Sequence, residues 1–112
     1  MPQPRGTGIK AAVAVHDLFL FAQALQSGKL LSPLLVKQAT TWSVSHPAYG
    51  FGFDVLSHGA YGHGGAGPGG NGELRVLPDT GYVLAALANR DPSMATDVVK
   101  LITAILPRAR AR

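Results

Sequence analysis

The most informative stretch of the sequence is Tyr61-Gly-His-Gly-Gly-Ala-Gly-Pro-Gly-Gly-Asn-Gly-Glu-Leu-Arg-Val-Leu77. Seven of the 14 glycines of the chain fall between Gly62 and Gly72, inside this segment. The end of the segment, residues 73–77, has the apolar and branched side chains of a strand. We therefore expect a short strand over residues 60–63, a glycine-rich loop after it, and a second strand over residues 73–77.

Further strands are predicted on both sides of this segment. Residues 49–55 alternate Tyr, Phe, Phe and Val with Gly or Asp, which predicts a strand with one buried face. Residues 82–88 form another apolar run, preceded by Pro78-Asp-Thr-Gly81. This tetrapeptide predicts a hairpin with a type I turn and Gly81 in the left-handed conformation. The sequence predicts an antiparallel sheet of about four strands.

Helices are predicted before and after the strands. Apolar residues at helical spacing run from about Val13 to Leu25, with Gly28 as the C-terminal cap. Ser32-Pro33 begins a short second helix that ends near Thr41. Asp91-Pro92 opens a last helix, which Pro107 ends. Strands grouped between helices indicate an α+β fold rather than alternating βαβ units.

Composition indicates one small domain over residues 1–112, with an irregular lead-in at 1–10 and a basic tail at 107–112. Hydrophobic residues make up 46% of the 112 residues, which supports one core. The absence of Cys excludes disulfides, thiolate zinc sites and cysteine nucleophiles. No apolar run has the roughly 18 residues of a membrane helix, and residues 1–10 lack the apolar core of a signal peptide. We expect no membrane association, and the compartment is not indicated.

The net charge of +4 comes mostly from the tail. Arg108, Arg110 and Arg112 are three of the ten basic residues, so seven remain against six acidic residues. No aromatic residues interleave with the basic ones to form a stacking surface. We therefore expect no nucleic-acid partner.

Three familiar motifs fail on inspection. Gly65-Ala-Gly-Pro-Gly-Gly70 has the spacing of a dinucleotide loop, but a predicted strand follows it where a helix N-terminus is needed. The four histidines, His16, His46, His58 and His63, lack the spacing of a metal site. A triad built on Ser57 lacks the Gly-x-Ser-x-Gly elbow. We expect no cofactor and no metal.

Five segments in order resemble the C-terminal part of the serine β-lactamase-like superfamily, which includes class C β-lactamases, esterases and DD-peptidases. The resemblance runs from about Gly8 to Leu106. The segments are Asp17-Leu through Leu25, Gly28-Lys-Leu-Leu-Ser-Pro33, Tyr49-Gly-Phe-Gly-Phe53, Tyr61-Gly-His-Gly-Gly65, and Pro78-Asp-Thr-Gly81 with Leu87-Ala-Asn-Arg90. The fourth is similar to the third catalytic motif of the family, Lys-Thr-Gly in many members and His-x-Gly in esterase-like ones.

This resemblance implies a substrate-binding site at His63, Gly64, Gly65 and Ala66. His63 would take the place of the motif's lysine and face the substrate. The N–H of Ala66 would be one donor of the oxyanion hole, and the glycines would let substrate lie close to the backbone. A plain hairpin loop is the alternative interpretation of these glycines.

The chain departs from the family at the nucleophile. None of its six serines is followed three residues later by Lys, so Ser-x-x-Lys is absent. Tyr-x-Asn and Tyr-x-Ser are absent as well. The resemblance, together with these missing motifs, thus implies a C-terminal fragment of a serine hydrolase that is inactive alone. The parent of such a fragment would acylate a serine with a β-lactam, ester or peptide. The expected partner is the missing N-terminal catalytic half, or a second copy joined through the sheet edge. The alternative function is a non-catalytic interaction module that uses this edge.

Overall fold

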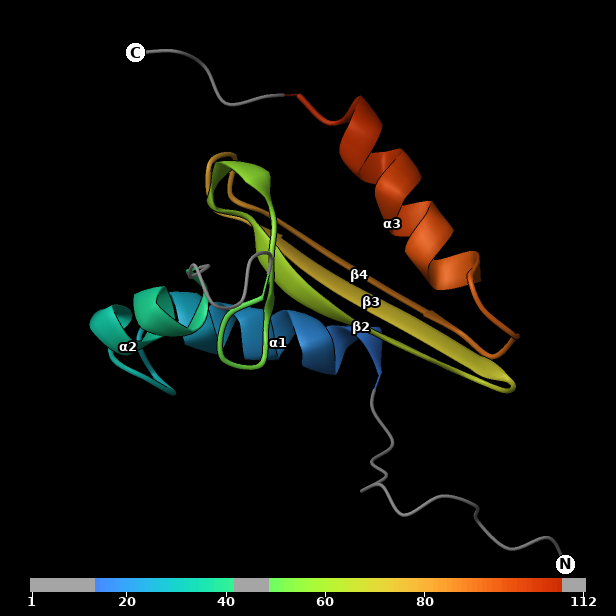
Figure 1. The fold of residues 1–112 in the computed structure, drawn as a ribbon, viewed down its shortest axis with the longest axis horizontal. Coiled ribbons are helices and arrows are strands. Elements are labelled where there is room, and N and C mark those ends of the chain that lie inside the picture. The colour runs from blue at the N-terminus through green and yellow to red at the C-terminus, as the bar shows by residue number, and fades with distance from the viewer. Residues whose placement is uncertain (1–13, 42–48, 108–112) are drawn as a thin grey trace, which may run out of the picture.

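The computed structural model describes residues 14–41 and 49–107, which form a sheet between helices (Figure 1). Helix α3 (Met94–Ile105) lies on one face of the sheet, and α1 (Val15–Gln26) lies on the other. The short helix α2 (Pro33–Ala39) follows α1. The predicted α+β architecture, with N-terminal helices and a C-terminal helix around the strands, is confirmed. The lead-in at 1–10, His46 and the tail arginines lie outside the described residues.

The sheet has four antiparallel strands in the order β1-β2-β3-β4. They are β1 (Asp54–Val55), β2 (Tyr61–Gly67), β3 (Gly70–Leu77) and β4 (Tyr82–Ala88). The predicted hairpin between β3 and β4 is confirmed, because Leu77 pairs with Tyr82 and Gly81 has a φ of +83°. A one-turn 3₁₀ helix (Ser57–Gly59) joins β1 to β2.

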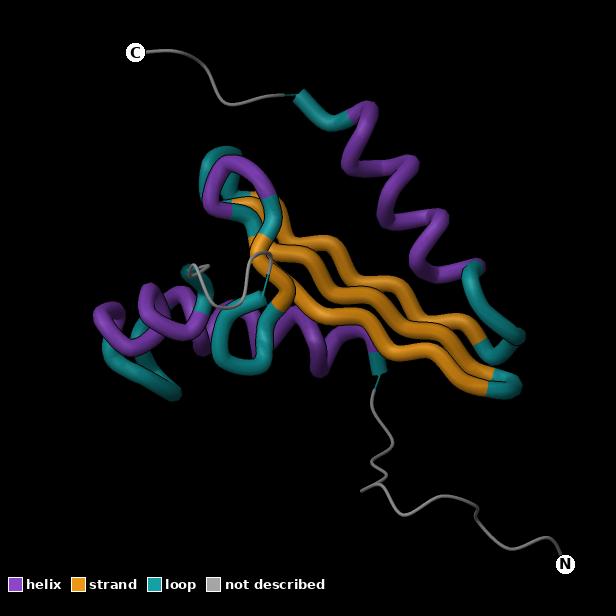
Figure 2. Tube along the Cα trace, in the orientation of Figure 1, coloured by secondary structure: helices purple, strands orange, loops and turns teal. Residues whose placement is uncertain are grey.

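The glycine-rich segment forms a long hairpin, so the predicted loop is wrong. β2 and β3 pair along their whole length, down to Gly67 opposite Gly70 (Figure 2). Only Pro68 and Gly69 connect them, and Gly69 has a φ of +76°. A proline followed by a left-handed glycine suits a type II turn. Glycine weakens strand propensity, but here the backbone pairing with β3 holds the extended conformation.

The predicted strand over residues 49–55 is also wrong in its first half. Gly52 has a φ of +84°, and the chain turns there so that Tyr49 pairs with Asp54 of the same segment. Phe51 at the tip of this turn is 80% exposed, where the sequence predicts burial. The alternating pattern marks a tight turn that leads into the two-residue strand β1.

The helix ends follow local capping chemistry, with one difference from the prediction. Gly28 adopts a φ of +80° after α1, and the Ser32 hydroxyl accepts a hydrogen bond from Leu35 N–H at 3.3 Å. The last helix begins at Met94 with Ser93 as its cap residue, and Asp91 lies outside it. The Asp91 carboxylate accepts a hydrogen bond from Gly69 N–H at 2.7 Å, which ties the β2–β3 turn to the segment before α3.

The core lies between α1 and the sheet. Its buried side chains come from α1, β2 and β3, and Val76 is fully buried. The members are Ala22, Leu25, Tyr61, Leu74 and Val76. On the opposite face, α3 packs on β3 and β4 through Ala95 and Val99. The sheet that carries the motif residues is therefore held between α1 and α3 by buried side chains on both of its faces.

Candidate active-site edge

Strand β2 carries the four predicted site residues, and one of its edges is open beside them. β1 pairs only with Tyr61 and Gly62, before the motif begins. Within the described ranges, no strand pairs with that side of β2 from His63 to Gly67. An open strand edge offers backbone N–H and C=O groups to a ligand. The structure therefore places His63, Gly64, Gly65 and Ala66 consecutively along a strand edge that is unpaired in the described residues.

The His63 side chain is exposed and contacts Tyr49. The Tyr49 hydroxyl lies 3.4 Å from His63 Nε2, and the two rings meet edge to face with centroids 6.2 Å apart. Tyr49 reaches this position because the turn at Gly52 folds residues 49–53 back beside the sheet. The sequence offered both residues as parts of separate motifs, but it did not indicate their contact.

The two glycines of the motif have different surroundings. A side chain at Gly64 would lie 2.5 Å from Glu73 Oε1, so this glycine gives room to a carboxylate of β3. A side chain at Gly65 would meet no atom within 4 Å. Gly65 and Ala66 are both exposed. The space beside them is open, as the approach of a substrate to the backbone requires.

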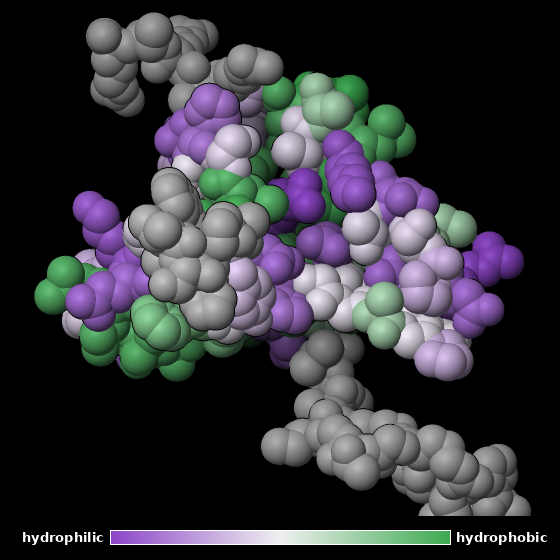
Figure 3. Space-filling view, in the orientation of Figure 1, coloured by the Kyte–Doolittle hydropathy of each residue, from purple (hydrophilic) through white to green (hydrophobic). Residues whose placement is uncertain are grey.

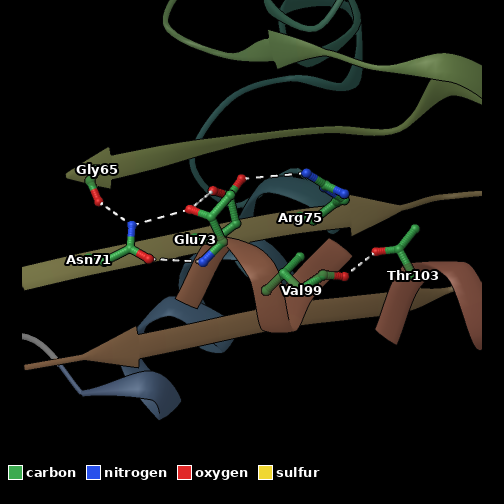
Figure 4. Close-up of polar contacts among 7 residues, drawn as sticks. Gly65, Asn71, Glu73, Arg75, Val99 and Thr103 are labelled. Carbon is green, nitrogen blue, oxygen red and sulfur yellow. Dashed lines mark hydrogen bonds and ion pairs between the residues drawn. The ribbon is translucent and has the colours of Figure 1, made fainter. Parts of the chain in front are cut away.

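A buried polar network lies directly behind this edge, on the α3 face of the sheet (Figure 4). Asn71 and Glu73 of β3 are only 6% and 9% exposed. The Thr96 hydroxyl on α3 donates to Glu73 Oε1 at 3.1 Å, and Asn71 Nδ2 donates to Gly65 O at 3.0 Å. Buried polar groups are costly unless they are hydrogen-bonded, so these bonds fix the group as a unit. The sequence alone does not indicate this network.

Arg75 extends the network along β3. Its Nη2 lies 3.6 Å from Glu73 Oε2, with both side chains mostly buried. The Arg75 guanidinium thus balances the charge of the Glu73 carboxylate on the α3 face of the sheet. Asn71, Glu73 and Arg75 alternate along β3, so their side chains share the face of the sheet on which α3 packs.

The other sequence candidates lie away from this edge. Ser57 and His58 line a cavity of about 490 Å³ together with Arg75 and the end of α3, and none of the four motif residues lines it. Among residues 14–41 and 49–107, no cluster of three or more His, Asp or Glu could hold a metal ion. In the same ranges, no helix has the length and apolar character needed to cross a membrane.

The structure thus has an antiparallel sheet with helices on both faces and His63-Gly-Gly-Ala66 on an open strand edge. The Beta-lactamase family model matches residues 5–106. The chain therefore belongs to the Beta-lactamase family, within the serine β-lactamase-like superfamily.

The fold is similar to that of a penicillin binding protein from Bacillus halodurans, with 23% sequence identity and a TM-score of 0.72. This match covers 84% of the chain and 31% of the Bacillus halodurans protein. The chain thus spans about a third of the length of that structure. No curated protein sequence matches the chain.

Proposed function

We propose that this chain forms the substrate-binding sheet edge of a β-lactamase-like serine hydrolase. The open edge of β2 at His63–Ala66 carries this proposal, because it presents free backbone groups beside an exposed histidine. Membership of the Beta-lactamase family supports acyl transfer from a β-lactam, ester or peptide as the reaction class. The chain contributes binding and electrostatic stabilisation to that reaction.

Each residue of the edge has a physical role in this proposal. A serine oxygen attacks the carbonyl carbon of the substrate, and the carbonyl oxygen gains negative charge. Ala66 N–H donates a hydrogen bond to that oxygen. The bare backbone at Gly65 lets the acyl group lie against β2. The His63 imidazole, held beside the Tyr49 hydroxyl, faces the substrate as a polar group.

The nucleophile must come from outside this chain, since none of its serines is part of Ser-x-x-Lys. We propose that the partner is the N-terminal catalytic half of the same fold. An upstream reading frame that encodes Ser-x-x-Lys would support this proposal, and its absence from the same transcript would contradict it.

Turnover assays test the proposed role of the chain directly. We expect the purified chain to hydrolyse neither nitrocefin nor p-nitrophenyl esters above the buffer rate. Added to a separately expressed N-terminal half, it should restore turnover, and His63→Ala should reduce that restored rate. Turnover by the chain alone that disappears in His63→Ala would contradict the requirement for an external nucleophile.

A second candidate function is a non-catalytic module that self-associates through β4. The outer edge of β4 is unpaired in the described structure, and the strand contains no Lys, Arg, Pro or Gly to block further pairing. Helix α3, which packs on β4, also has an exposed apolar stripe. Its members are Met94, Val98, Leu101 and Ile105. Green atoms gather near the C-terminal end of α3 in the upper part of Figure 3.

Two copies paired along β4 would form one continuous sheet with a two-fold axis. We expect a dimer by light scattering after size exclusion. Leu87→Lys places a charge at the open edge and should give monomers. Leu101→Lys should do the same if the α3 stripe joins the interface, because Leu101 is 67% exposed and its replacement leaves the core intact. A monomer at high concentration would rule out self-association.

A further inference from the structure

The Asn71 side chain contacts the peptide unit that carries the proposed oxyanion donor. Asn71 Nδ2 donates a hydrogen bond to the carbonyl oxygen of Gly65 at 3.0 Å (Figure 4). The carbonyl of Gly65 and the N–H of Ala66 belong to the same planar peptide group. Asn71 therefore binds the carbonyl end of the same peptide group whose N–H end is the proposed donor to the substrate.

The direction of this contact, like the pairing of Gly65 with Gly72 of β3, shows where Ala66 N–H points. In a trans peptide, the C=O and the N–H point in opposite directions. Asn71 lies on β3, so the Gly65 carbonyl points to the β3 side of β2. Ala66 N–H then points to the opposite side, which is the open edge. A hydrogen bond to the carbonyl also polarises the peptide group and strengthens its N–H as a donor.

The Asn71 amide is itself fixed from two sides. Thr96 N–H donates to Asn71 Oδ1 at 2.9 Å, and Asn71 Nδ2 donates to Thr96 Oγ1 at 3.1 Å. Because a backbone N–H can only donate, it assigns Oδ1 as the facing atom and leaves Nδ2 for Gly65. The Thr96 hydroxyl in turn donates a hydrogen bond to Glu73 Oε1 at 3.1 Å. The amide has no freedom to flip without breaking these bonds.

We infer that Asn71 is a positioning residue for the oxyanion hole, which orients and polarises the Gly65–Ala66 peptide group. The inference rests on the proposed role of Ala66 as oxyanion donor. Asn71 does not touch the substrate, because it is 6% exposed and lies on the α3 face. It acts through the peptide group alone.

The test uses the full chain, labelled with ¹³C and ¹⁵N, and compares Asn71→Ala with Thr96→Val. Asn71→Ala removes the donor to Gly65. Thr96→Val removes the hydroxyl but keeps the Thr96 N–H position and the Asn71 donor, so it perturbs the network without removing the contact. Should Asn71→Ala fail to fold, Asn71→Asp removes the donor and keeps the acceptor for the residue 96 N–H.

We expect the Gly65 carbonyl ¹³C resonance to move to lower frequency in Asn71→Ala, together with the Ala66 amide resonances. Thr96→Val should leave the Gly65 carbonyl resonance near its wild-type position. If the Asn71 variant leaves both resonances unchanged, or if Thr96→Val moves them equally, the positioning role is overturned.

A titration with benzylpenicilloate, the ring-opened carboxylate of benzylpenicillin, then separates the two proposals. Its carboxylate oxygen should shift the Ala66 amide in the wild-type chain. Asn71→Ala should weaken this binding by less than the roughly five- to tenfold loss that removal of one direct hydrogen bond to the ligand would cause, because Asn71 acts only through the peptide group. A wild-type Ala66 amide that does not respond would contradict the oxyanion role of the edge. The carbonyl shift of Gly65 would still decide whether Asn71 orients the peptide.

Discussion

The Tyr49 hydroxyl lies 3.4 Å from Nε2 of His63, so a residue from the turn before β1 contacts the first residue of the motif on β2. Two motifs that are 14 residues apart in sequence thus meet in space. The edge-to-face packing of the rings restricts the imidazole to one side of the strand. His63 has a defined environment although its side chain is exposed.

Tyr49→Phe tests this contact. The variant keeps the ring packing and removes only the hydroxyl, so the imidazole ¹⁵N resonances of His63 should shift. Because the contact is long and exposed, the free energy of unfolding should change by less than about 1 kcal/mol. The ring resonances of His16 and His58 serve as internal controls and should not move. Unchanged His63 resonances would show that the hydroxyl does not interact with the ring.

Gly62 and Gly67 of β2 should respond differently to substitution by alanine. A methyl group at Gly62 would overlap the carbonyl oxygen of Leu74, whereas one at Gly67 would meet no atom within 4 Å. Gly62→Ala should lower the free energy of unfolding by about 1 to 3 kcal/mol, the range of overpacking. Gly67→Ala, the matched control, should stay within about 0.5 kcal/mol of the wild type. Urea denaturation measures both, and equal stability of the two variants would contradict the close approach of β2 to β3.

The sequence indicates those elements whose side chains follow a periodic apolar pattern. β4 and the second half of β3 were predicted because their branched and apolar side chains mark a strand. The left-handed conformation of Gly81 is predicted because the turn between β3 and β4 needs a residue with positive φ at its end. The helices follow from apolar spacing, and Gly28 and Ser32 mark two of their ends, whereas the predicted start of α3 at Asp91 is wrong.

The glycine-rich half of the hairpin could not be predicted in the same way, because glycines carry no side-chain period. Residues 64–67 are extended because β3 pairs with them, and that information lies in the partner strand. The site residues were named through the family motif. The contact between Asn71 and Thr96 is not predictable from the sequence, because the two residues are 25 positions apart and only the packing of α3 on the sheet brings them together.

The stability of the chain should fall in alkali because of Tyr61. Burial raises the pKa of the Tyr61 hydroxyl above its ordinary value of 10.0. Above about pH 10 the unfolded chain therefore loses this proton first and binds fewer protons than the folded chain. The free energy of unfolding should then decrease as the pH rises through this range, and be unaffected by this group at neutral pH.

Tyr61→Phe should flatten that alkaline decrease, as measured by urea denaturation at a series of pH values. Tyr82→Phe is the matched control, because Tyr82 is exposed and its removal should leave the decrease in place. Identical pH profiles of the wild type and Tyr61→Phe would mean that burial of Tyr61 does not hold its proton in the folded state.

Adjacent valines of α3 test whether the helix packs on the sheet as the structure has it. Val99 is 1% exposed and faces β3 and β4, whereas Val98 is 40% exposed on the apolar stripe. Val99→Ala should lower the free energy of unfolding by about 2 kcal/mol, because it removes buried methyl groups and leaves a cavity. Val98→Ala should change it by no more than about 0.5 kcal/mol, since alanine favours the helix and little buried surface is lost. If the two variants lose the same stability in a monomeric sample, α3 does not pack through the Val99 face, and the Thr96 contact with Asn71 would lose its support.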